Sequence, residues 1–421
     1  MKPRNRQTET PAGVQLHPRK LPPGWRWVKM GEVVAEALPG FACGERDPKG
    51  VVQLRMNNVD RRGRILLEEF LRVPADEQMV ARYHLVPGDV MFNNTNSTEL
   101  VGKTALFTGF SEPVVFSNHF TRLRAAKGLE PAFLAWWLLQ QWQRKVFESI
   151  CNRWVGQSAV KNDKLLGLVL PLPPLSEQRR IAGILNEQMR EVEKARRATE
   201  AQLEAASVLP AAYLRGVFDS QEARRWPKKR LGDVCEIVGG NSLPAAGEAT
   251  NGDRVYCLKV SDLDGPYYDG QRLNGGAFFT SRILAGNRIL EPGAVVFPKR
   301  GGAIATNKKR ILAVPSVLDP NLMGVQPVSQ DVLLPSYLHR WFDSWSLASL
   351  QSGNVIPQIN RQDLAPLVIP LPPISVQTYV TKSLRDLIDR AKQVCSDLSD
   401  RLAEVNKLPA ALLRKAFAGG V

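Results

Sequence analysis

Apolar residues recur at alternating steps of three and four positions near the end of the chain, and polar residues fill most of the positions between them. Over residues 380–412 the repeating set is interrupted by one polar residue, Arg401, and consists of Val380, Leu384, Leu387, Ala391, Val394, Leu398, Val405, Leu408 and Leu412. A heptad pattern kept for more than four repeats is typical of a coiled coil. We therefore expect a long helix over residues 370–421, with a short tail at its end.

A weaker copy of this pattern lies 199 positions earlier, so we expect a first long helix over residues 171–218. Its apolar positions are Ile181, Leu185, Val192, Ala195, Ala206 and Leu209, and its interruptions are Gln188, Thr199 and Gln202. Residues 171–218 align without a gap on residues 370–417, and both stretches open on Pro-Leu-Pro-Pro and carry Leu-Pro-Ala-Ala near the end. A fixed length with drifting sequence is typical of a helix that serves as a spacer.

Capping residues and prolines suggest where these helices begin and bend. Ser176 and Ser375 follow prolines that cannot continue a helix backwards, and serine is a favoured N-cap. Pro210 and Pro409 should kink each helix or start a new segment. Since one chain contains two helices whose apolar faces have equal length, the simplest arrangement is that these two faces pack against each other. Pairing of each helix with another chain or with its own domain remains an alternative, as does a role of the prolines as adaptor ligands.

Fainter repeats extend over the rest of the chain, in the same order in both halves and at offsets of 199 to 205 residues. The matching segments are residues 25–33 with 226–234, 54–60 with 258–264, 85–92 with 290–297, and 131–137 with 335–341. A repeat of this length predicts two domains of one fold, each followed by one helix. We expect a flexible tail at 1–24, domains at 25–170 and 219–369, and the helices between and after them.

Within each domain, short alternating runs bounded by Gly, Pro and Asn predict strands, at 51–56, 90–92, 114–116, 255–260 and 295–297. Residues 130–147 and 334–350 read as helices, and their tryptophans are expected in the core. The fold class expected is α+β, with mostly antiparallel sheets and with the two long helices forming an antiparallel coiled coil.

The charge balance points to a polyanionic partner. The 421 residues carry a formal net charge of +15, with a pI near 9.7. The basic residues cluster at 55–64, 224–230 and 299–310. Clustered Lys and Arg in a basic protein favour nucleic acid as the ligand.

Other features narrow the class of protein. No apolar run approaches the length of a membrane span, and the first 23 residues have no apolar core typical of a signal peptide. The five cysteines are widely spaced, which favours reduced thiols and a cytoplasmic location over disulfides or a zinc site.

Three segments of each half are candidates for DNA contact, because amides and hydroxyls bond phosphates and base edges, and basic residues bond phosphates and guanine. In the first half they are Arg55, Asn57, Asn58, Asn93, Asn94, Thr95, Asn96, Ser97, Lys103, Arg153 and Gln157. In the second half they are Lys259, Ser261, Lys299, Arg300, Asn307, Lys308, Lys309, Arg310, Gln358, Asn360 and Arg361. The alternative for each residue is an ordinary place on a solvated loop.

Catalytic signatures are weak. Val101-Gly102-Lys103-Thr104 imitates the end of a phosphate-binding loop, but Ser97 stands where the leading glycine is required. The tetrapeptide of adenine methyltransferases is absent, and four histidines lie far apart without metal or triad spacing. We therefore expect no catalytic residues, no metal and no cofactor.

Together, these motifs resemble the specificity subunit of type I DNA restriction–modification systems. The resemblance rests on the duplicated Trp-initiated opening at residues 25 and 226, the Pro-Gly-Asp-Val strand at 87–90, and the Pro-Leu-Pro-Pro-Leu-Ser-Glu-Gln entry at 171–178, and it covers about residues 21–417. The second entry departs from the first, with Val376 where the first has Glu177. The resemblance implies two target recognition domains that each read half of a bipartite double-stranded DNA site. It also implies a coiled coil that sets the spacer and docks two methyltransferase subunits, which restriction subunits then join.

The residues alone lead to a similar expectation. Two similar domains can face one duplex alike only through an approximate two-fold axis, which requires antiparallel helices. Because the halves differ in sequence, the half-sites should differ, so the target should not be the palindrome that a homodimer reads. Two alternatives remain: a specificity subunit of a related system without a translocating nuclease, and a coiled-coil adaptor joining two protein-binding modules.

Overall fold

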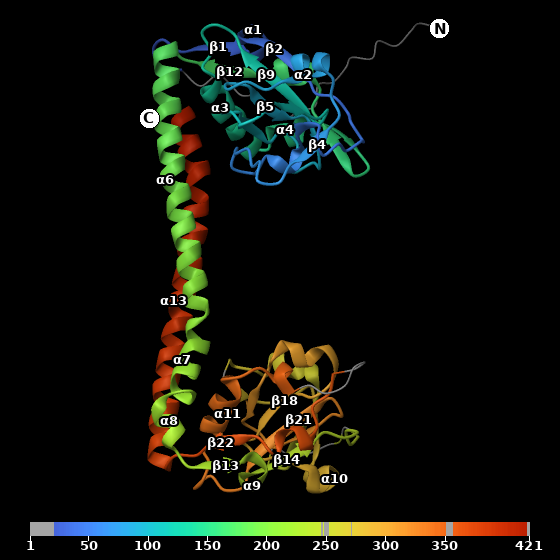
Figure 1. Cartoon of the computed structure of the whole chain (residues 1–421), viewed down its shortest axis with the longest axis vertical. Helices are drawn as coiled ribbons and strands as arrows, with labels where there is room; N and C mark the ends of the chain where they lie inside the picture. The colour runs from blue at the N-terminus through green and yellow to red at the C-terminus, as the bar shows by residue number, and fades with distance from the viewer. Residues whose placement is uncertain (1–20, 246, 248–251, 271, 351–356, 419–421) are drawn as a thin grey trace, which may run out of the picture. The chain divides into compact units, whose positions relative to one another are not determined.

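The computed structural model describes residues 21–418, apart from 246, 248–251, 271 and 351–356 (Figure 1). Most of the expected N-terminal tail, residues 1–20, and the last three residues lie outside the described part. The chain forms two compact units, one from the described residues of Met1–Thr199 and Arg401–Val421, the other from Glu200–Asp400. Each unit holds one globular domain and a part of each long helix.

The first domain is built from short strands and helices. Its strands are β1 (Arg26–Lys29), β2 (Val34–Pro39), β3 (Val51–Leu54), β4 (Leu71–Val73), β5 (Val90–Asn93), β6 (Thr95–Asn96), β7 (Thr104–Leu106), β8 (Val114–Phe116), β9 (Phe120–Ala125), β10 (Asn152–Trp154), β11 (Gln157–Ala159) and β12 (Val169–Leu172). Its helices are α1 (Met30–Val33), η1 (Met56–Asn58), α2 (Glu77–Tyr83), α3 (Pro131–Gln143), α4 (Val146–Ile150) and α5 (Asn162–Leu166).

The second domain repeats this plan. Its strands are β13 (Lys228–Arg230), β14 (Cys235–Gly239), β15 (Arg254–Leu258), β16 (Arg272–Leu273), β17 (Phe278–Ser281), β18 (Val295–Pro298), β19 (Arg310–Leu312), β20 (Ser316–Leu318), β21 (Leu322–Pro327) and β22 (Val368–Pro370). Its helices are α9 (Leu231–Val234), η2 (Val260–Asp264), α10 (Arg282–Ala285), η3 (Gly286–Arg288), η4 (Gly301–Thr306), α11 (Pro335–Asp343), η5 (Leu347–Leu350) and α12 (Arg361–Leu364).

Sheet topology confirms that the two domains share one fold. The first contains the antiparallel sheet β2-β9-β5-β7, and the second contains β14-β21-β18-β19 with β16 added at the edge. Each domain also has a three-stranded sheet with one parallel pair, β3 with β8 and β15 with β20. The entry strand pairs with the exit strand in both domains, β1 with β12 and β13 with β22. The expected α+β class with mostly antiparallel sheets is correct.

Several expected elements end earlier than their patterns suggest. The strands expected at 51–56 and 255–260 stop at Leu54 and Leu258, because the chain then turns into η1 and η2. The helix expected at 130–147 breaks after Gln143, where Lys145 adopts a left-handed φ of 61°. The helix expected at 334–350 ends at Asp343 and is followed by η5. All five tryptophans of these segments are buried or half-buried, as expected.

Two long helical runs follow the domains, and they pack against each other within each unit (Figure 1). The first consists of α6 (Leu175–Ser207), α7 (Leu209–Phe218) and α8 (Gln221–Arg225), and the second is α13 (Ile374–Phe417). In the first unit Ile181 and Leu185, near the start of α6, share a core with Leu413 and Ala416, near the end of α13. In the second unit Leu214 of α7 shares a core with Leu384, near the start of α13. The helices therefore run antiparallel.

The residues that form the buried seam of these helices differ in part from those expected. At every second position of the seam, the buried residue is the one that follows the expected residue in the sequence. In α13, Leu387, Val394 and Leu408 are 37–45% exposed, whereas Ile388 is buried and Leu402 half-buried. In α6, Gln188, Ala195 and Gln202 are exposed, and Met189, Arg196 and Leu203 take the inward places. The observed steps of three and four therefore run through Ala391, Cys395, Leu398 and Leu402. This corrects the expected heptad assignment and places Arg401 outside the seam.

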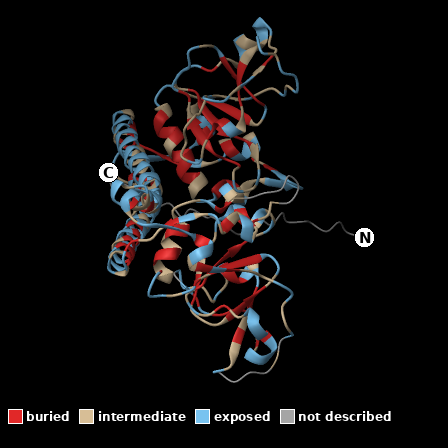
Figure 2. Ribbon diagram, turned by 60° about the horizontal axis from the view of Figure 1, so that its bottom comes forward, coloured by how far each residue is buried: buried red, intermediate tan, exposed pale blue. Residues whose placement is uncertain are grey.

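The serines expected as N-caps lie inside the helices, because α6 begins at Leu175 and α13 at Ile374. Pro210 does start a new segment, since α6 ends at Ser207 and α7 begins at Leu209, whereas Pro409 lies within a continuous α13. Figure 2 shows that the buried residues gather on the sheets and neighbouring helices of the domains, while most positions of the long helices are exposed.

A buried glutamine joins each long helix to its domain in the same way. The Gln178 side chain accepts a hydrogen bond from the backbone N–H of Glu130 at 2.8 Å and donates to the carbonyls of Gly128 and Pro173. The Gln377 side chain bonds the N–H of Leu334 and the carbonyls of Val332 and Pro372 in the same pattern. Both side chains are fully buried. Each amide therefore fixes the start of a long helix to the N-terminus of α3 or α11.

Candidate nucleic-acid interface

Two of the candidate segments of the first domain meet in one small sheet. Strands β10, β11 and β6 form an antiparallel sheet in which Ser158 pairs with Asn96 and Ala159 with Thr95. The Thr98 hydroxyl bonds the buried Ser158 hydroxyl at 2.8 Å, which ties the two segments together. The sheet thus places the candidates of residues 95–97 beside the exposed candidates Arg153 and Gln157.

The third segment of the first domain lies near the same loop. Burial lowers the pKa of His119, and the positive charge of Arg55 lowers it further. The His119 carbonyl accepts hydrogen bonds from the Asn93 side chain at 2.8 Å and from the Asn94 N–H. Arg55 is half-buried and Asn57 exposed. Lys103 links this segment to the loop, because its Nζ donates to the Met56 carbonyl and its own carbonyl accepts from the Asn93 N–H.

Three candidate asparagines face the interior of the domain instead. The Asn58 side chain accepts from the Arg55 N–H and donates to the carbonyls of Leu66 and Glu69. Asn93 and Asn94 are almost fully buried, and their amides also bond the side chains of Asn96 and Thr95. These amides hold the loop in shape, so their role is internal, and the candidate set for DNA contact is smaller than expected here.

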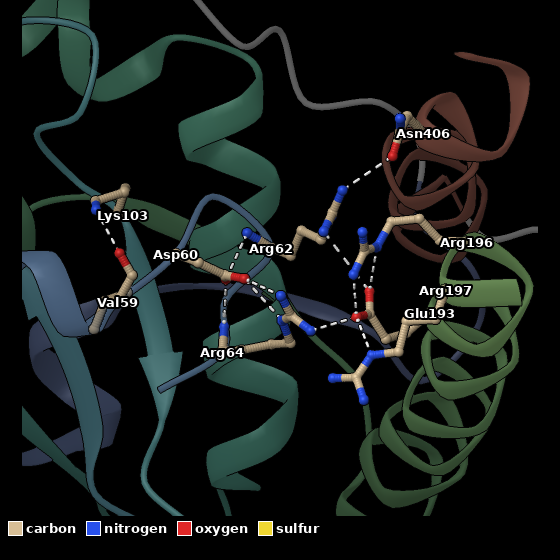
Figure 3. A network of polar contacts seen from close by, with 9 residues as sticks. All are labelled: Val59, Asp60, Arg62, Arg64, Lys103, Glu193, Arg196, Arg197 and Asn406. Atoms are coloured by element: carbon tan, nitrogen blue, oxygen red, sulfur yellow. Dashed lines mark hydrogen bonds and ion pairs between the residues drawn. The ribbon is translucent and has the colours of Figure 1, made fainter. Parts of the chain in front are cut away.

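Lys103 is also turned inward. Its Nζ donates to the carbonyls of Met56 at 3.1 Å and Val59 at 2.5 Å, and burial lowers the pKa of its ammonium group (Figure 3). The side chain is 6% exposed. Lys103 therefore braces the turn after β3, and neither a phosphate-binding role nor a DNA contact follows from its position.

Part of the basic cluster at residues 55–64 is held against α6. Arg64 bonds Asp60 at 2.7 Å and Glu193 of α6 at 2.5 Å, and Arg62 lies 3.7 Å from Glu193 and donates to Asn406 of α13 (Figure 3). Glu193 also bonds Arg196 and Arg197. Arg62 and Arg64 therefore connect the first domain to both helices, instead of projecting toward a separate ligand.

The second domain joins its candidate segments in a corresponding way. Arg300 and Gln358 form an antiparallel bridge, and the Ile359 N–H donates to the Lys299 carbonyl at 2.9 Å. Arg300 and Arg361 are exposed, while Lys299, Gln358 and Asn360 are half-buried. Burial and the charge of Arg300 lower the pKa of Lys299. The residues after β18 and those before α12 thus lie side by side, as their counterparts do in the first domain.

The basic run at 308–310 is mostly engaged within the domain. Lys308 and Arg310 both pair with Asp264, and the Arg310 guanidinium lies 3.9 Å from the centroid of the Tyr268 ring. Lys309 is 2% exposed and donates to the Trp345 carbonyl at 2.6 Å, and burial lowers its pKa to about 8. This lysine is therefore a structural residue of the second domain.

The remaining candidates of this half lie at the surface. The Asn307 side chain accepts from the Leu347 N–H, although the residue itself is exposed. Lys259 and Ser261, at the turn after β15, are exposed, and the Lys259 ammonium lies 4.8 Å from the centroid of the Phe278 ring. These residues keep their place as candidates.

The arrangement offers hydrogen-bond donors and positive charge, which suit binding. Among the described residues, no group of three His, Cys, Asp or Glu side chains is placed to hold a metal ion. In the same part of the chain, no helix has the length and apolar character needed to cross a membrane. The surface candidates that remain are the residues that could contact phosphates and base edges.

Two features of the interface could not be found from residue type alone. Trp154 and Val155, at the turn between β10 and β11, are 59% and 106% exposed, although tryptophan and valine are usually expected inside. The sequence signal for this turn is Gly156, because glycine readily adopts the positive φ of 77° found here. Outside the interface, the buried Gln178 and Gln377, which join each domain to its helix, are marked in the sequence only by their identity in the duplicated entry.

The model of the type I restriction modification DNA specificity domain matches residues 85–204. A Methanocaldococcus jannaschii protein, the MjaX type I restriction enzyme specificity subunit by its name, is 25% identical over 338 residues, 74% of each chain. The Escherichia coli EcoDI specificity subunit is 32% identical over 88 residues, 20% of each chain.

Solved structures give the same picture. A chain from a study of complex assembly and conformational transition of the type I restriction–modification system has a TM-score of 0.69 at 25% identity, covering 96% of this chain and 100% of that one. The HsdS subunit of Thermoanaerobacter tengcongensis has the same fold, with a TM-score of 0.63 at 24% identity, covering 96% of this chain and 99% of that one.

Proposed function

Because the chain belongs to the specificity subunits of type I restriction–modification systems, we propose that its domains at 25–170 and 219–369 each read one half of a bipartite, non-palindromic DNA site. Subunits of this family are non-catalytic and supply DNA recognition to the complex. The chemistry then belongs to partner subunits, which this chain directs to their target.

The observation that carries the proposal is the repetition of one interface in both domains. In the first domain β6, which follows β5, pairs with β11, which precedes α5. In the second domain Arg300, which follows β18, bridges Gln358, which precedes α12. In each, side chains with donors and positive charge remain at this junction. One fold that presents two different sets of side chains is suited to reading two different half-sites.

The long helices support the second part of the proposal, which concerns spacing and assembly. An antiparallel pair of helices suits this role, because two like domains that face one duplex need an approximate two-fold axis. We infer that the coiled coil sets the spacer length and docks two methyltransferase subunits, with restriction or translocase subunits joining this core. Such a complex acts on chromosomal and incoming DNA, so the location proposed is the cytoplasm.

Methylation by the reconstituted complex tests this function. The chain, purified with its methyltransferase subunit, should protect one bipartite sequence in a random-sequence library, with a fixed spacer between two unlike halves. Omission of the chain is the control and should abolish the sequence preference. Methylation of a palindrome, or of sites without a common sequence, would contradict the proposal.

Salt dependence gives a second test of DNA binding. A protein that neutralises several phosphates releases counterions, so its affinity falls steeply as salt rises. The chain with its methyltransferase should bind the specific duplex at least about a thousandfold more tightly than random DNA. Weak salt dependence with no sequence preference would favour a protein-binding adaptor instead.

A further inference from the structure

The turn between β10 and β11 exposes two large apolar side chains on an ordered support. Trp154 is 59% exposed, and among the other described tryptophans the next is Trp27 at 37%. Val155 is fully exposed. Val155 and Gly156 form a two-residue turn, and Gly156 has a φ of 77°, which a side chain would disfavour. The apolar tip is therefore a defined feature of the hairpin.

The hairpin is held in place at its base. Asn152 pairs with Ala159 and Arg153 with Ser158, and β11 continues the pairing to β6. Ser158 is buried and bonded to Thr98. A tip held by three paired strands is ordered before it meets a ligand, which lowers the entropic cost of binding.

The surroundings of the tip are polar and basic. The same sheet carries Arg153 and Gln157 beside Trp154, and Thr95, Asn96 and Asn152 toward its base, and Arg153 donates to the Glu148 carbonyl at 3.0 Å. The Glu148 carboxylate lies 3.7 Å from the Lys145 ammonium, so the nearby negative charge is paired. An apolar protein surface would be a poor match for these neighbours, whereas DNA matches both the donors and the positive charge.

We propose that Trp154, with Val155 beside it, is an apolar wedge that enters a groove of the first half-site and inserts at a base step. This rests on the proposed function and names the element of the first domain that distorts the DNA. A two-stranded ribbon fits the major groove. Apolar side chains that insert between bases unstack them and make recognition depend on how easily the step deforms. Arg153 and Gln157 then bond the phosphates or base edges on either side.

The experiment uses the full chain with its methyltransferase subunit and the duplex identified by methylation. Single adenines along the first half-site, except the adenine that the complex methylates and therefore flips out itself, are replaced by 2-aminopurine, whose fluorescence rises when the base loses its stacking partner. The wild-type complex should raise the fluorescence at one step of this half-site. Trp154→Ala should abolish the rise and weaken specific binding by roughly tenfold or more, whereas Trp154→Phe should keep part of both.

Controls separate the wedge from other effects. Phe110→Ala removes another exposed aromatic side chain of the same domain and should leave both signals unchanged, because Phe110 packs on Phe70 and is not part of the β10–β11 hairpin. Binding to random DNA should change less than twofold in Trp154→Ala. If Trp154→Ala binds the specific duplex as tightly as the wild type does, the proposal that Trp154 is a wedge is wrong.

Two further results would overturn the proposal while leaving the function intact. Weaker binding of Trp154→Ala with wild-type fluorescence would mean that the side chain contacts DNA without inserting. Loss of the methyltransferase from the purified complex would mean that the tip binds a protein subunit. Failure of the proposed function itself would appear earlier, as the absence of any bipartite methylated sequence.

Discussion

At the scale of single residues, the buried Gln178 and Gln377 have the most demanding environment. Each side chain is fully buried and bonds one backbone N–H and two backbone carbonyls. An unsatisfied buried polar group costs roughly 1–3 kcal/mol. Since one amide serves the domain and the helix together, its loss should loosen their junction.

We expect Gln178→Ala to leave the Glu130 N–H and its neighbouring carbonyls unpaired and to destabilise the start of α3 by about 2–3 kcal/mol. Hydrogen–deuterium exchange over residues 128–134 should become much faster. Gln188→Ala is the matched control, because Gln188 lies on the same helix and is exposed. Equal exchange in the two variants would show that the Gln178 side chain does not hold the junction.

Glu193 should make the first unit sensitive to acid. Hydrogen bonds from Arg196 and Arg197, together with the charge of Arg64, lower the pKa of this carboxyl from 4.5 to about 2. A depressed folded-state pKa adds stability that is complete above pH 4.5 and is lost as the pH falls toward 2. Because the side chain is only 19% exposed, the contribution is roughly 2–3 kcal/mol.

We therefore expect Glu193→Gln to lower the free energy of unfolding of the first unit at pH 7 by this amount and to flatten its dependence on pH between 4.5 and 2. Urea titration at several pH values measures both effects. Glu191→Gln removes a carboxylate that is 61% exposed and 3.9 Å from Lys194, and should change little. The prediction fails if the two variants share one pH profile.

Residue type predicted the interface segments better than it predicted the role of each residue in them. In the amide-rich run at 93–97 only Ser97 is exposed, whereas Asn93 and Asn94 are buried and bond the His119 carbonyl and the Thr121 hydroxyl. Lys103, Lys308 and Arg310 read equally well as phosphate ligands. Their partners are carbonyls and carboxylates from other parts of the chain, which a linear sequence does not pair.

At the scale of elements, the duplication predicted the helices well and their inward faces less well. Leu387, Val394 and Leu408 continue a seam through Leu384 and Ala391, but so do Ile388, Cys395 and Leu402. The two sets differ by one position, so both satisfy steps of three and four. Which set is buried depends on the residues that pack against α13. The periodicity of one helix does not show from which side the domain and the other helix pack.

A pair of substitutions in α13 tests the corrected seam. Leu384→Ala should destabilise the second unit by about 2–5 kcal/mol, because Leu384 is fully buried in its core. Leu387→Ala should change the free energy of unfolding by less than about 0.5 kcal/mol, because this side chain is 37% exposed. Urea denaturation followed by tryptophan fluorescence measures the difference. Equal losses would favour the seam first expected from the sequence.

At the scale of the whole molecule, the proposed coiled coil should determine the distance between half-sites. Seven residues inserted at matching positions of α6 and α13 keep the seam in register and add about 10 Å of helix. We expect the spacer of the methylated site to lengthen by roughly two to three base pairs, with both half-sites unchanged. An unchanged spacer would show that the helices do not set the distance.

The division of the chain into two similar domains and two long helices was also the feature most readily predicted from the sequence. Matching segments at nearly constant offsets predicted two domains of one fold, because a duplicated gene segment folds twice by the same rules. The target sequence was not accessible in this way. Base readout depends on the geometry of a few loop side chains, of which Arg55, Arg153 and Gln157 in the first domain are the main surface candidates.

The most direct test of the account is the exchange of one domain. Residues 25–170 are replaced by the corresponding domain of a relative with a different target, and the methylated sites of cells expressing the hybrid with its methyltransferase are mapped by single-molecule sequencing. The account predicts that one half-site changes while the other half-site and the spacer stay the same. A change in both half-sites, or in neither, would contradict it.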